Sequence, residues 1–313
     1  MTPHAHPPAE PAGGALGEFS LAPEDFAALA GIVQRTTGIQ LPETKRPLMV
    51  SRLSKRLRAL RLTSFAEYRH LIERGDDAGR DELARMISSL TTNVTRFFRE
   101  CRHFEHLSRA VLSDLVARAR AGDRVRLWSA GCSTGEEPYS LAFTLLSACP
   151  EAPKLDIRIL ATDIDPEVVR VGAKALYPAA TLRALPPDQQ SRWFKAQANG
   201  ADSFEVAGAA RDLVAFRVLN LMQDWPFRRG FDVIMCRNVV IYFDTDTQDR
   251  LWTRFAAHLP AGGRLYIGHS ERISASARRF FTLDGVTSYV RNDVGAGDRA
   301  GPPGRQHQGA MTQ

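Results

Sequence analysis

The chain has 313 residues, of which 44% are hydrophobic and 24% charged, and its formal net charge is +6. This composition is ordinary for a globular protein with room for two domains, and no apolar run approaches the about 20 residues that a membrane-spanning helix needs. The basic excess, with a pI near 9.4, indicates an acidic partner: nucleic acid, an anionic membrane or an acidic protein surface.

The two ends of the chain, residues 1–18 and 292–313, are predicted to be disordered tails because they are rich in Gly and Pro and lack periodicity. The first also lacks the basic start and apolar core of a signal peptide. The cysteines stand at positions 101, 132, 149 and 236, without paired spacing. We therefore expect reduced thiols, a cytoplasmic location, and neither disulfides nor a metal.

Residues 19–90 are predicted to form an all-helical domain. Apolar residues recur with helical spacing over 22–38, 47–60, 64–72 and 83–90. Ser64 and Glu67 have the spacing of a capping box, in which each satisfies a free backbone N–H of the other at a helix start.

The second of these helices is unusually basic, with no acid between Lys45 and Arg61. Arg52 and Arg56 are four residues apart on one face, with Lys55 beside them, and like charges at this spacing repel each other. We interpret this face as a docking surface for an acidic partner, and expect reversal of Arg52 and Arg56 to leave the fold intact. A merely solvated basic face is the alternative.

After a helix predicted over about 95–119, the chain has a strand, a glycine turn and a helix. The strand covers 125–128, Gly131 and Gly135 lie in the turn, and Glu136 and Glu137 open the helix. Such a turn forms a crevice at the carboxyl end of a parallel strand. The third glycine of the dinucleotide fingerprint is missing, and the two acids would repel a pyrophosphate. They suit a ribose or a cation, so S-adenosylmethionine fits; an acidic helix start without a ligand is the alternative.

The following residues continue an α/β pattern. Asp163 ends a strand over 157–162 and is placed to accept hydrogen bonds from ribose hydroxyls, whereas Asp165 suits a helix N-cap. Residues 173–219, with β-like runs at 203–206 and 213–218, are predicted to form an inserted antiparallel subdomain. Later strands at 231–236 and 265–268 precede a hairpin whose turn is expected at Asp284–Gly285. The predicted fold is thus a class I methyltransferase (Rossmann-like) sheet over 91–291, interrupted by this insertion.

Five segments of the chain resemble the CheR family of bacterial chemotaxis receptor methyltransferases. They are residues 91–100, 128–141, 161–165, 236–243 and 268–271, and the resemblance runs in order from about residue 20 to 290. It implies esterification of glutamate side chains on the cytoplasmic helices of membrane chemoreceptors, with S-adenosylmethionine as methyl donor and S-adenosylhomocysteine as product. It leaves open whether a receptor-tail peptide binds the insertion, and a monomer is the default expectation.

Carried over residue by residue, the resemblance implies a cofactor site formed by Asn93, Thr95, Arg99, Glu136, Glu137, Asp163, Asn220, Leu221, Asn238 and Val239. It also implies that Arg99 and Tyr242 flank the transferred methyl group. The choice between Glu136 and Glu137 stays open at this point.

The chemistry is consistent with a glutamate acceptor, because a carboxylate is ionised at neutral pH and needs no general base. Arg99 could hold that carboxylate in a fork and Tyr242 could face the sulfonium. The structural alternatives are pairing of Arg99 with Glu100 or Glu105, and a core position for Tyr242. The main rival function is a nucleic-acid methyltransferase, but residues 238–242 lack the prolines of the amine-methylating tetrad. A non-catalytic scaffold is disfavoured because Arg99, Asp163, Asn238 and Tyr242 are all intact.

Overall fold

The computed structural model describes residues 19–197 and 202–293. The first predicted tail and residues 294–313 of the second lie outside these ranges. The chain divides into two compact units, one formed by Met1–Ile32 with Leu41–Leu90 and the other by Val33–Gln40 with Thr91–Gln313. The units are described separately below.

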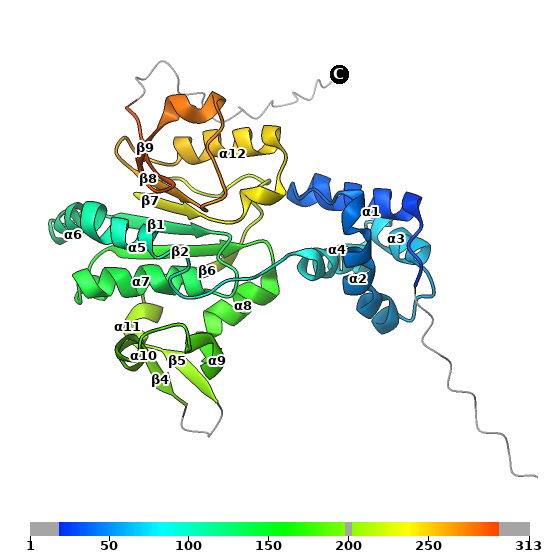
Figure 1. Cartoon of the computed structure of the whole chain (residues 1–313), viewed down its shortest axis with the longest axis horizontal. Helices are drawn as coiled ribbons and strands as arrows, with labels where there is room; N and C mark the ends of the chain where they lie inside the picture. The colour runs from blue at the N-terminus through cyan, green and yellow to red at the C-terminus, as the bar shows by residue number, and fades with distance from the viewer. Residues whose placement is uncertain (1–18, 198–201, 294–313) are drawn as a thin grey trace, which may run out of the picture. The chain divides into compact units, whose positions relative to one another are not determined.

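The first unit is helical (Figure 1). Its elements are α1 (Pro23–Thr37, whose last turn belongs to the second unit), η1 (Glu43–Lys45), α2 (Arg46–Leu60), α3 (Phe65–Glu73) and α4 (Asp77–Leu90). Leu53, Leu57 and Phe65 are buried in its core. The predicted cap of α3 is confirmed: the Ser64 hydroxyl accepts a hydrogen bond from the Glu67 N–H at 3.2 Å. The Glu67 carboxylate accepts from the N–H of Thr63, one residue before the expected partner.

A seven-stranded sheet in the order β6-β2-β1-β7-β8-β10-β9 organises the second unit. The strands are β1 (Val125–Ala130), β2 (Ile157–Asp163), β6 (Val214–Val218), β7 (Val233–Cys236), β8 (Arg264–Ile267), β9 (Phe281–Gly285) and β10 (Ser288–Arg291). The pairings β6–β2, β2–β1, β1–β7 and β7–β8 are parallel, whereas β10 is antiparallel to both of its neighbours. The predicted α/β class, with a closing antiparallel hairpin, is confirmed.

Helices cover both faces of this sheet (Figure 1). Successive residues of a strand point to opposite faces, and in β1 Leu127 packs into one buried cluster while Trp128 packs into the other. The helices are α5 (Arg102–His106), the π-helical turn η2 (Leu107–Val111), α6 (Leu112–Arg120), α7 (Glu136–Ala148), α8 (Pro166–Lys174), η4 (Val240–Tyr242), α12 (Thr245–Ala257) and short turns η3 (Ala152–Lys154) and η5 (Ser276–Phe280). Within the described ranges, no helix has the length and apolar character to cross a bilayer.

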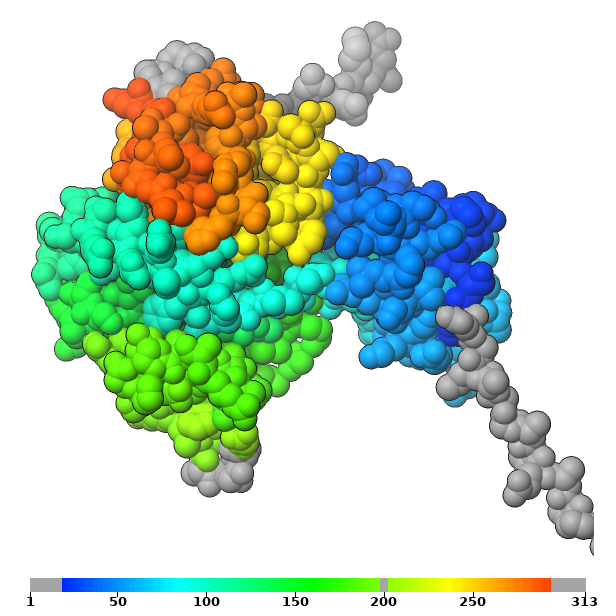
Figure 2. Space-filling model, viewed as in Figure 1, coloured from blue at the N-terminus to red at the C-terminus, as the bar shows by residue number. Residues whose placement is uncertain are grey.

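The insertion contains a small antiparallel sheet in the order β3-β5-β4. Its elements are β3 (Leu176–Pro178), α9 (Ala179–Leu182), α10 (Pro187–Trp193), β4 (Phe194–Ala196) and β5 (Ser203–Val206), and α11 (Gly208–Arg211) follows. It packs against the layer that contains α7, where Trp193 stacks on Phe143 with ring centroids 4.9 Å apart. The space-filling view shows the insertion and this layer as one continuous surface (Figure 2).

The assignment of residues 213–218 to the antiparallel subdomain is wrong. Val214–Val218 is β6, the edge strand of the main sheet, and it pairs in parallel with β2. A parallel pair needs a long crossover connection, and here the insertion forms part of it. Buried Phe216 packs over Gly172 of α8, where an added Cβ would lie 2.4 Å from the ring.

Two further predictions are corrected. The helix expected from about residue 95 begins only at Arg102, because Phe98 and Glu100 have φ angles of +51° and +56°, which no α-helix contains. The hairpin is present, but Asp284 and Gly285 belong to β9 and the turn lies at the next two residues, where Thr287 has φ +48°. The Thr287 hydroxyl lies 2.9 Å from buried His103 Nε2, a contact that holds the turn at this position.

Candidate functional site

The glycine turn after β1 is where two loops come into contact. Gly131 has φ +87°, and a Cβ added there would lie 2.3 Å from Cγ2 of Val239, in the loop after β7. Gly135 has φ +99°, and a Cβ there would lie 2.8 Å from the Tyr177 hydroxyl. Only glycine combines these backbone angles with such close approach. The turn therefore packs directly against the loop after β7 and against Tyr177.

Asp163 ends β2 beside this turn and is buried, with 8% of its surface exposed. Its carboxylate accepts hydrogen bonds from the backbone N–H groups of Ser133 at 2.8 Å and Asp165 at 3.1 Å. Burial raises the pKa of Asp163, and these N–H groups oppose that rise. Asp165 is the predicted N-cap, since it accepts from the Glu167 N–H at 2.9 Å, and its other oxygen accepts from Asn93 Nδ2 at 3.0 Å. Asn93 is thus connected through Asp165 to the end of β2, where Asp163 lies.

The two glutamates that open α7 have different surroundings. Glu136 is buried and accepts a hydrogen bond from the Thr134 hydroxyl at 2.6 Å. Glu137 accepts from the Ser129 hydroxyl at 2.7 Å and pairs with Arg237 at 3.0 Å. Burial raises the pKa of both carboxyl groups, and for Glu137 the charge of Arg237 opposes the rise. A cationic ligand would therefore compete with Arg237 for Glu137 but not for Glu136.

Arg237, directly after β7, joins three segments. Its guanidinium, only 1% exposed, pairs with Glu137 at 3.0 Å and Glu100 at 3.1 Å, and it donates a hydrogen bond to the Arg99 carbonyl. Glu100 also accepts from Asn238 Nδ2 at 3.3 Å. Burial alone would raise the pKa of Glu100, but Arg237 and Asn238 outweigh it and lower the pKa. The sequence reasoning missed Arg237, although a charged residue directly after a buried strand was a usable signal.

A second missed residue, Glu271, shapes the loop after β7. Its buried carboxylate accepts hydrogen bonds from the backbone N–H groups of Asn238 at 3.1 Å, Val239 at 2.9 Å and Val240 at 3.0 Å, and also from Gly268. Asn238 has φ +59°, a strained value that these bonds stabilise. Burial raises the pKa of Glu271, and the four N–H groups oppose the rise.

Arg99 and Tyr242, expected at the transferred methyl group, both lie on loops near β7. The half-buried Arg99 donates from Nη1 to the Val94 carbonyl at 2.8 Å. The alternative pairing with Glu100 is not observed, because that carboxylate pairs with Arg237. Tyr242 ends η4 and is half-buried, and it packs against the edge of the buried cluster that contains Trp128.

The remaining predicted cofactor residues are placed differently. The Asn220 amide donates to the Thr36 carbonyl at 2.6 Å and accepts from the Met222 N–H at 2.9 Å. Leu221 is buried, whereas Thr95 is half-buried. Hydrogen bonds therefore connect Asn93 with Asp165 and Ser133. They also connect Arg99 and Glu137 with Arg237 directly, and Asn238 with Arg237 through Glu100, while Asn220 belongs to a separate group.

The predicted docking residues lie on α2 in the helical unit. Arg56 donates twice to the Glu82 carboxylate, at 2.9 and 2.6 Å, and the Tyr68 hydroxyl donates to the same group at 2.9 Å. Arg52 donates to the Leu90 carbonyl at 2.7 Å. Lys55 is exposed. The structure instead predicts that reversal of Arg56 destabilises the fold, because Glu82 is buried and needs that partner.

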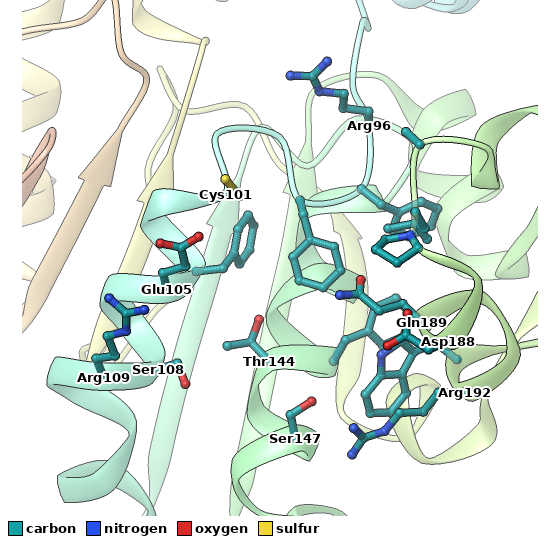
Figure 3. Close-up of a pocket in the computed structure, with 18 residues that line it drawn as sticks. Arg96, Cys101, Glu105, Ser108, Arg109, Thr144, Ser147, Asp188, Gln189 and Arg192 are labelled. Carbon is teal, nitrogen blue, oxygen red and sulfur yellow. The ribbon is translucent and has the colours of Figure 1, made fainter.

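A pocket of about 720 Å³ lies away from the glycine turn, between α5–η2, α7 and α10. In Figure 3, Glu105 and Arg109 lie on one side of α7, and Asp188 and Arg192 lie on the other. Its walls include aromatic rings, among them Phe98 and Trp193. None of the acids at the strand ends lines it, so it is distinct from the site described above.

Comparison with known proteins identifies the family. Residues 24–91 match the model of the CheR methyltransferase all-alpha domain, and residues 93–290 match that of the CheR methyltransferase SAM-binding domain. The chain belongs to the CheR methyltransferase family. It is 47% identical over 270 residues to a probable chemotaxis protein methyltransferase of Rhizobium etli, covering 86% of this chain and 100% of that protein.

Other relatives are chemotaxis protein methyltransferase 2 of Pseudomonas aeruginosa, 42% identical with 81% of this chain and 88% of that protein covered, and the chemotaxis protein methyltransferase of Escherichia coli, 39% identical with 87% and 92% covered. Together with the family match, they identify this CheR protein as an S-adenosylmethionine-dependent methyltransferase of chemotaxis.

The residues at the strand ends fit this cofactor. Asp163 supplies a buried carboxylate of the kind that binds ribose hydroxyls, and the glutamates of α7 supply negative charge for a cationic ligand. The glycine turn lets the backbone approach a ligand closely.

Proposed function

We propose that this CheR protein methylates glutamate side chains on the cytoplasmic helices of membrane chemoreceptors and forms glutamate methyl esters. The observation that carries this proposal is Arg99. Among the described residues its half-buried guanidinium makes no ion pair, and only Nη1 has a hydrogen-bond partner, the Val94 carbonyl. An arginine with free donors beside the cofactor residues suits an anionic acceptor. A receptor acceptor would also place the enzyme in the cytoplasm.

S-adenosylmethionine, when bound, supplies an electrophilic methyl group on a sulfonium. The residues proposed to hold it are Asn93, Thr95, Arg99, Glu136, Glu137, Asp163, Asn220, Leu221, Asn238 and Val239. Arg99 orients the acceptor carboxylate, and Tyr242 faces the reacting groups. No residue needs to remove a proton, because the glutamate acceptor is already ionised at neutral pH. Orientation in a water-poor site therefore supplies most of the acceleration.

A nucleic-acid methyltransferase is less consistent with the loop after β7. Enzymes that methylate exocyclic amines use a side-chain amide there to polarise the amine. In this chain residues 238–242 lack the prolines that accompany this amide. The loop is instead shaped by Glu271, which accepts from the Asn238 backbone N–H.

The proposed reaction is tested by transfer of tritiated methyl groups from S-adenosylmethionine to receptor-containing membranes. We expect label on the receptor that is released by mild base, as a methyl ester is. Membranes in which the acceptor glutamates are replaced by alanine are the control. Base-stable label, or label in added nucleic acid instead of the receptor, would contradict the proposal.

Asp163→Asn is expected to weaken binding of S-adenosylmethionine and S-adenosylhomocysteine equally, because the ribose is common to both. Loss of charge-assisted hydrogen bonds costs about 1.5–3 kcal/mol, which is roughly 10- to 150-fold in Kd. Asparagine keeps the size of the side chain, so the turn at Ser133 is disturbed less than by alanine. Titration calorimetry measures both ligands, with exposed Asp114→Asn as the control. Unchanged affinity would remove Asp163 from the cofactor site.

Arg99→Gln distinguishes two roles for the guanidinium. If it orients the acceptor carboxylate, kcat falls by more than about ten-fold while the Kd of S-adenosylhomocysteine changes little. If it binds the cofactor, KM for S-adenosylmethionine rises and kcat is nearly unchanged. Steady-state kinetics with receptor membranes separates these outcomes, and wild-type values of both constants would exclude either role.

We further propose that the basic face of α2, formed by Arg52, Lys55 and Arg56, docks the acidic receptor helices. Substitution of Lys55, the exposed residue of this face, tests the proposal without disturbing the ion pair of Arg56. Lys55→Glu is expected to slow receptor methylation about five-fold at low salt and less at high salt, because electrostatic steering is screened.

The matched control is Lys154→Glu. Lys154 is also exposed, but it lies just before β2, at the opposite end of the strand from Asp163. If both variants methylate receptors at the same rate, α2 is only a solvated face.

The insertion offers a second surface for the receptor. β3 and β4 are the edge strands of its sheet, and an edge strand has backbone groups to which an extended peptide can add. We infer that a receptor-tail peptide, in receptors that have one, binds here. One copy of the chain contains every proposed site residue, so a monomer suffices.

A further inference from the structure

A cluster of two histidines and a glutamate lies beside the site and has no role in the proposed reaction. Glu100 precedes α5, His103 lies in α5, and His269 follows β8. His103 Nδ1 and His269 Nε2 each lie 3.7 Å from Glu100 Oε2. The three atoms all lie within 4.8 Å of one another.

The hydrogen bonds of His103 determine which nitrogen has the proton. Nε2 lies 2.9 Å from the Val286 carbonyl, which can only accept, and 2.9 Å from the Thr287 hydroxyl, which can accept from the same N–H. We therefore assign the proton to Nε2. Nδ1 therefore carries a lone pair. It is buried, has no hydrogen-bond partner among the described residues, and faces the Glu100 carboxylate.

Two acceptors thus face each other with no hydrogen between them. Two electron-pair donors at this separation are the arrangement that a cation stabilises. A hydrogen bond from Nε2–H to a backbone carbonyl is also the outer-shell contact typical of metal-binding histidines.

The carboxylates that pair with Arg237 outnumber it. The carboxylates of Glu100 and Glu137 share one guanidinium, that of Arg237, which leaves one excess negative charge. Arg237 approaches Glu100 Oε2 at 3.1 Å, and an ionised carboxylate oxygen can accept from it and still bind a second partner.

We propose that Glu100, His103 and His269 form a binding site for a divalent ion of the zinc class. The ligand atoms are Glu100 Oε2, His103 Nδ1 and His269 Nε2. Two imidazoles and a carboxylate are a ligand set that Zn²⁺ prefers, with the fourth position open. Tetrahedral ligands stand about 3.4 Å apart, so the 3.7 Å separations need only a small approach. The side chain of His269 is 43% exposed and free to make it.

The site uses none of the four cysteines, which is why their scattered spacing gave no sign of it. An ion bound there would fix Glu100, and with it the turn that carries Arg99. The inference does not depend on the glutamate acceptor, because metal binding is measured without methyl transfer.

The test is a Zn²⁺ titration of the untagged, full-length protein in competition with a chromophoric chelator. We expect one site. His269→Ala should lower its Zn²⁺ affinity at least about ten-fold, because even the loss of an outer-shell partner of a metal has an effect of that size. His70→Ala, at a histidine with a 71% exposed side chain in the helical unit, should bind as the wild type does. Co²⁺ in place of Zn²⁺ should give visible absorption bands that His269→Ala abolishes.

His4 and His6, outside the described residues, are potential competing ligands. A His4→Ala/His6→Ala variant should therefore retain the site. The proposal is overturned if the wild type has no stoichiometric site, if His269→Ala binds Zn²⁺ as tightly as His70→Ala, or if the site disappears with His4 and His6.

Discussion

Arg237→Met is expected to lower the free energy of unfolding by about 3–5 kcal/mol, the cost of breaking a buried ion pair by removing one partner. It is also expected to reduce methyl transfer at least about 100-fold, because small misplacements of reacting groups have effects of that size. The physical reason is that Glu100 and Glu137 lose their shared cation, and the Arg99 carbonyl loses its donor. Urea denaturation measures the first effect, and transfer of tritiated methyl groups to receptor-containing membranes measures the second.

The control is Arg118→Met, which removes a more exposed ion pair with Asp232 in the same unit. Exposed pairs contribute about 0–1 kcal/mol, so a similar loss in both variants would refute the central role of Arg237.

A second variant separates charge balance from positioning. Arg237→Met/Glu100→Gln removes one of the two carboxylates and should recover part of the stability. If Arg237 positions the Arg99 turn, activity stays low in the double variant, and millimolar guanidinium should partly restore it by occupying the vacated space. Full recovery of activity with stability would show that the arginine only balances charge.

Arg56→Glu is expected to destabilise the helical unit by about 3–5 kcal/mol. The change removes both hydrogen bonds to Glu82 and places a second carboxylate beside it. Glu82 then keeps only the neutral hydroxyl of buried Tyr68 as a partner, which cannot balance its charge.

Urea denaturation followed by circular dichroism measures this loss. Lys55→Glu, one residue earlier on α2 and exposed, should change stability by less than about 0.5 kcal/mol. Equal stability of the two variants would show that the Glu82 pair is unimportant. Lost receptor methylation in an Arg56 variant is therefore not by itself a sign of lost docking.

Local signals were sufficient to predict much of this fold. The Ser64 cap, the Asp165 cap and the strand–glycine turn–helix after β1 each depend on residues within a few positions of one another, so the sequence contains them directly. Binary patterning gave the α/β class in the same way. The partner of β6 was not predictable, because its short apolar run is compatible with either sheet and only the crossover length decides.

In the candidate site, too, residues with local signals were predicted and residues with distant partners were not. Asp163 was predicted as a site residue from its position directly after a strand. The contacts of Arg237 were not predicted, because they depend on three loops folding to one point. The tautomer of His103 depends likewise on a carbonyl 183 residues away.

The contacts of Arg237 also bear on the order of folding. The guanidinium meets partners 100 and 137 positions earlier in the chain, and contacts between such distant residues form slowly because long loops must close first. During synthesis, a nascent chain shorter than 237 residues lacks the group that neutralises Glu100 and Glu137. The proposed cofactor site should therefore form among the last features of the domain, and partly folded chains should bind S-adenosylmethionine poorly.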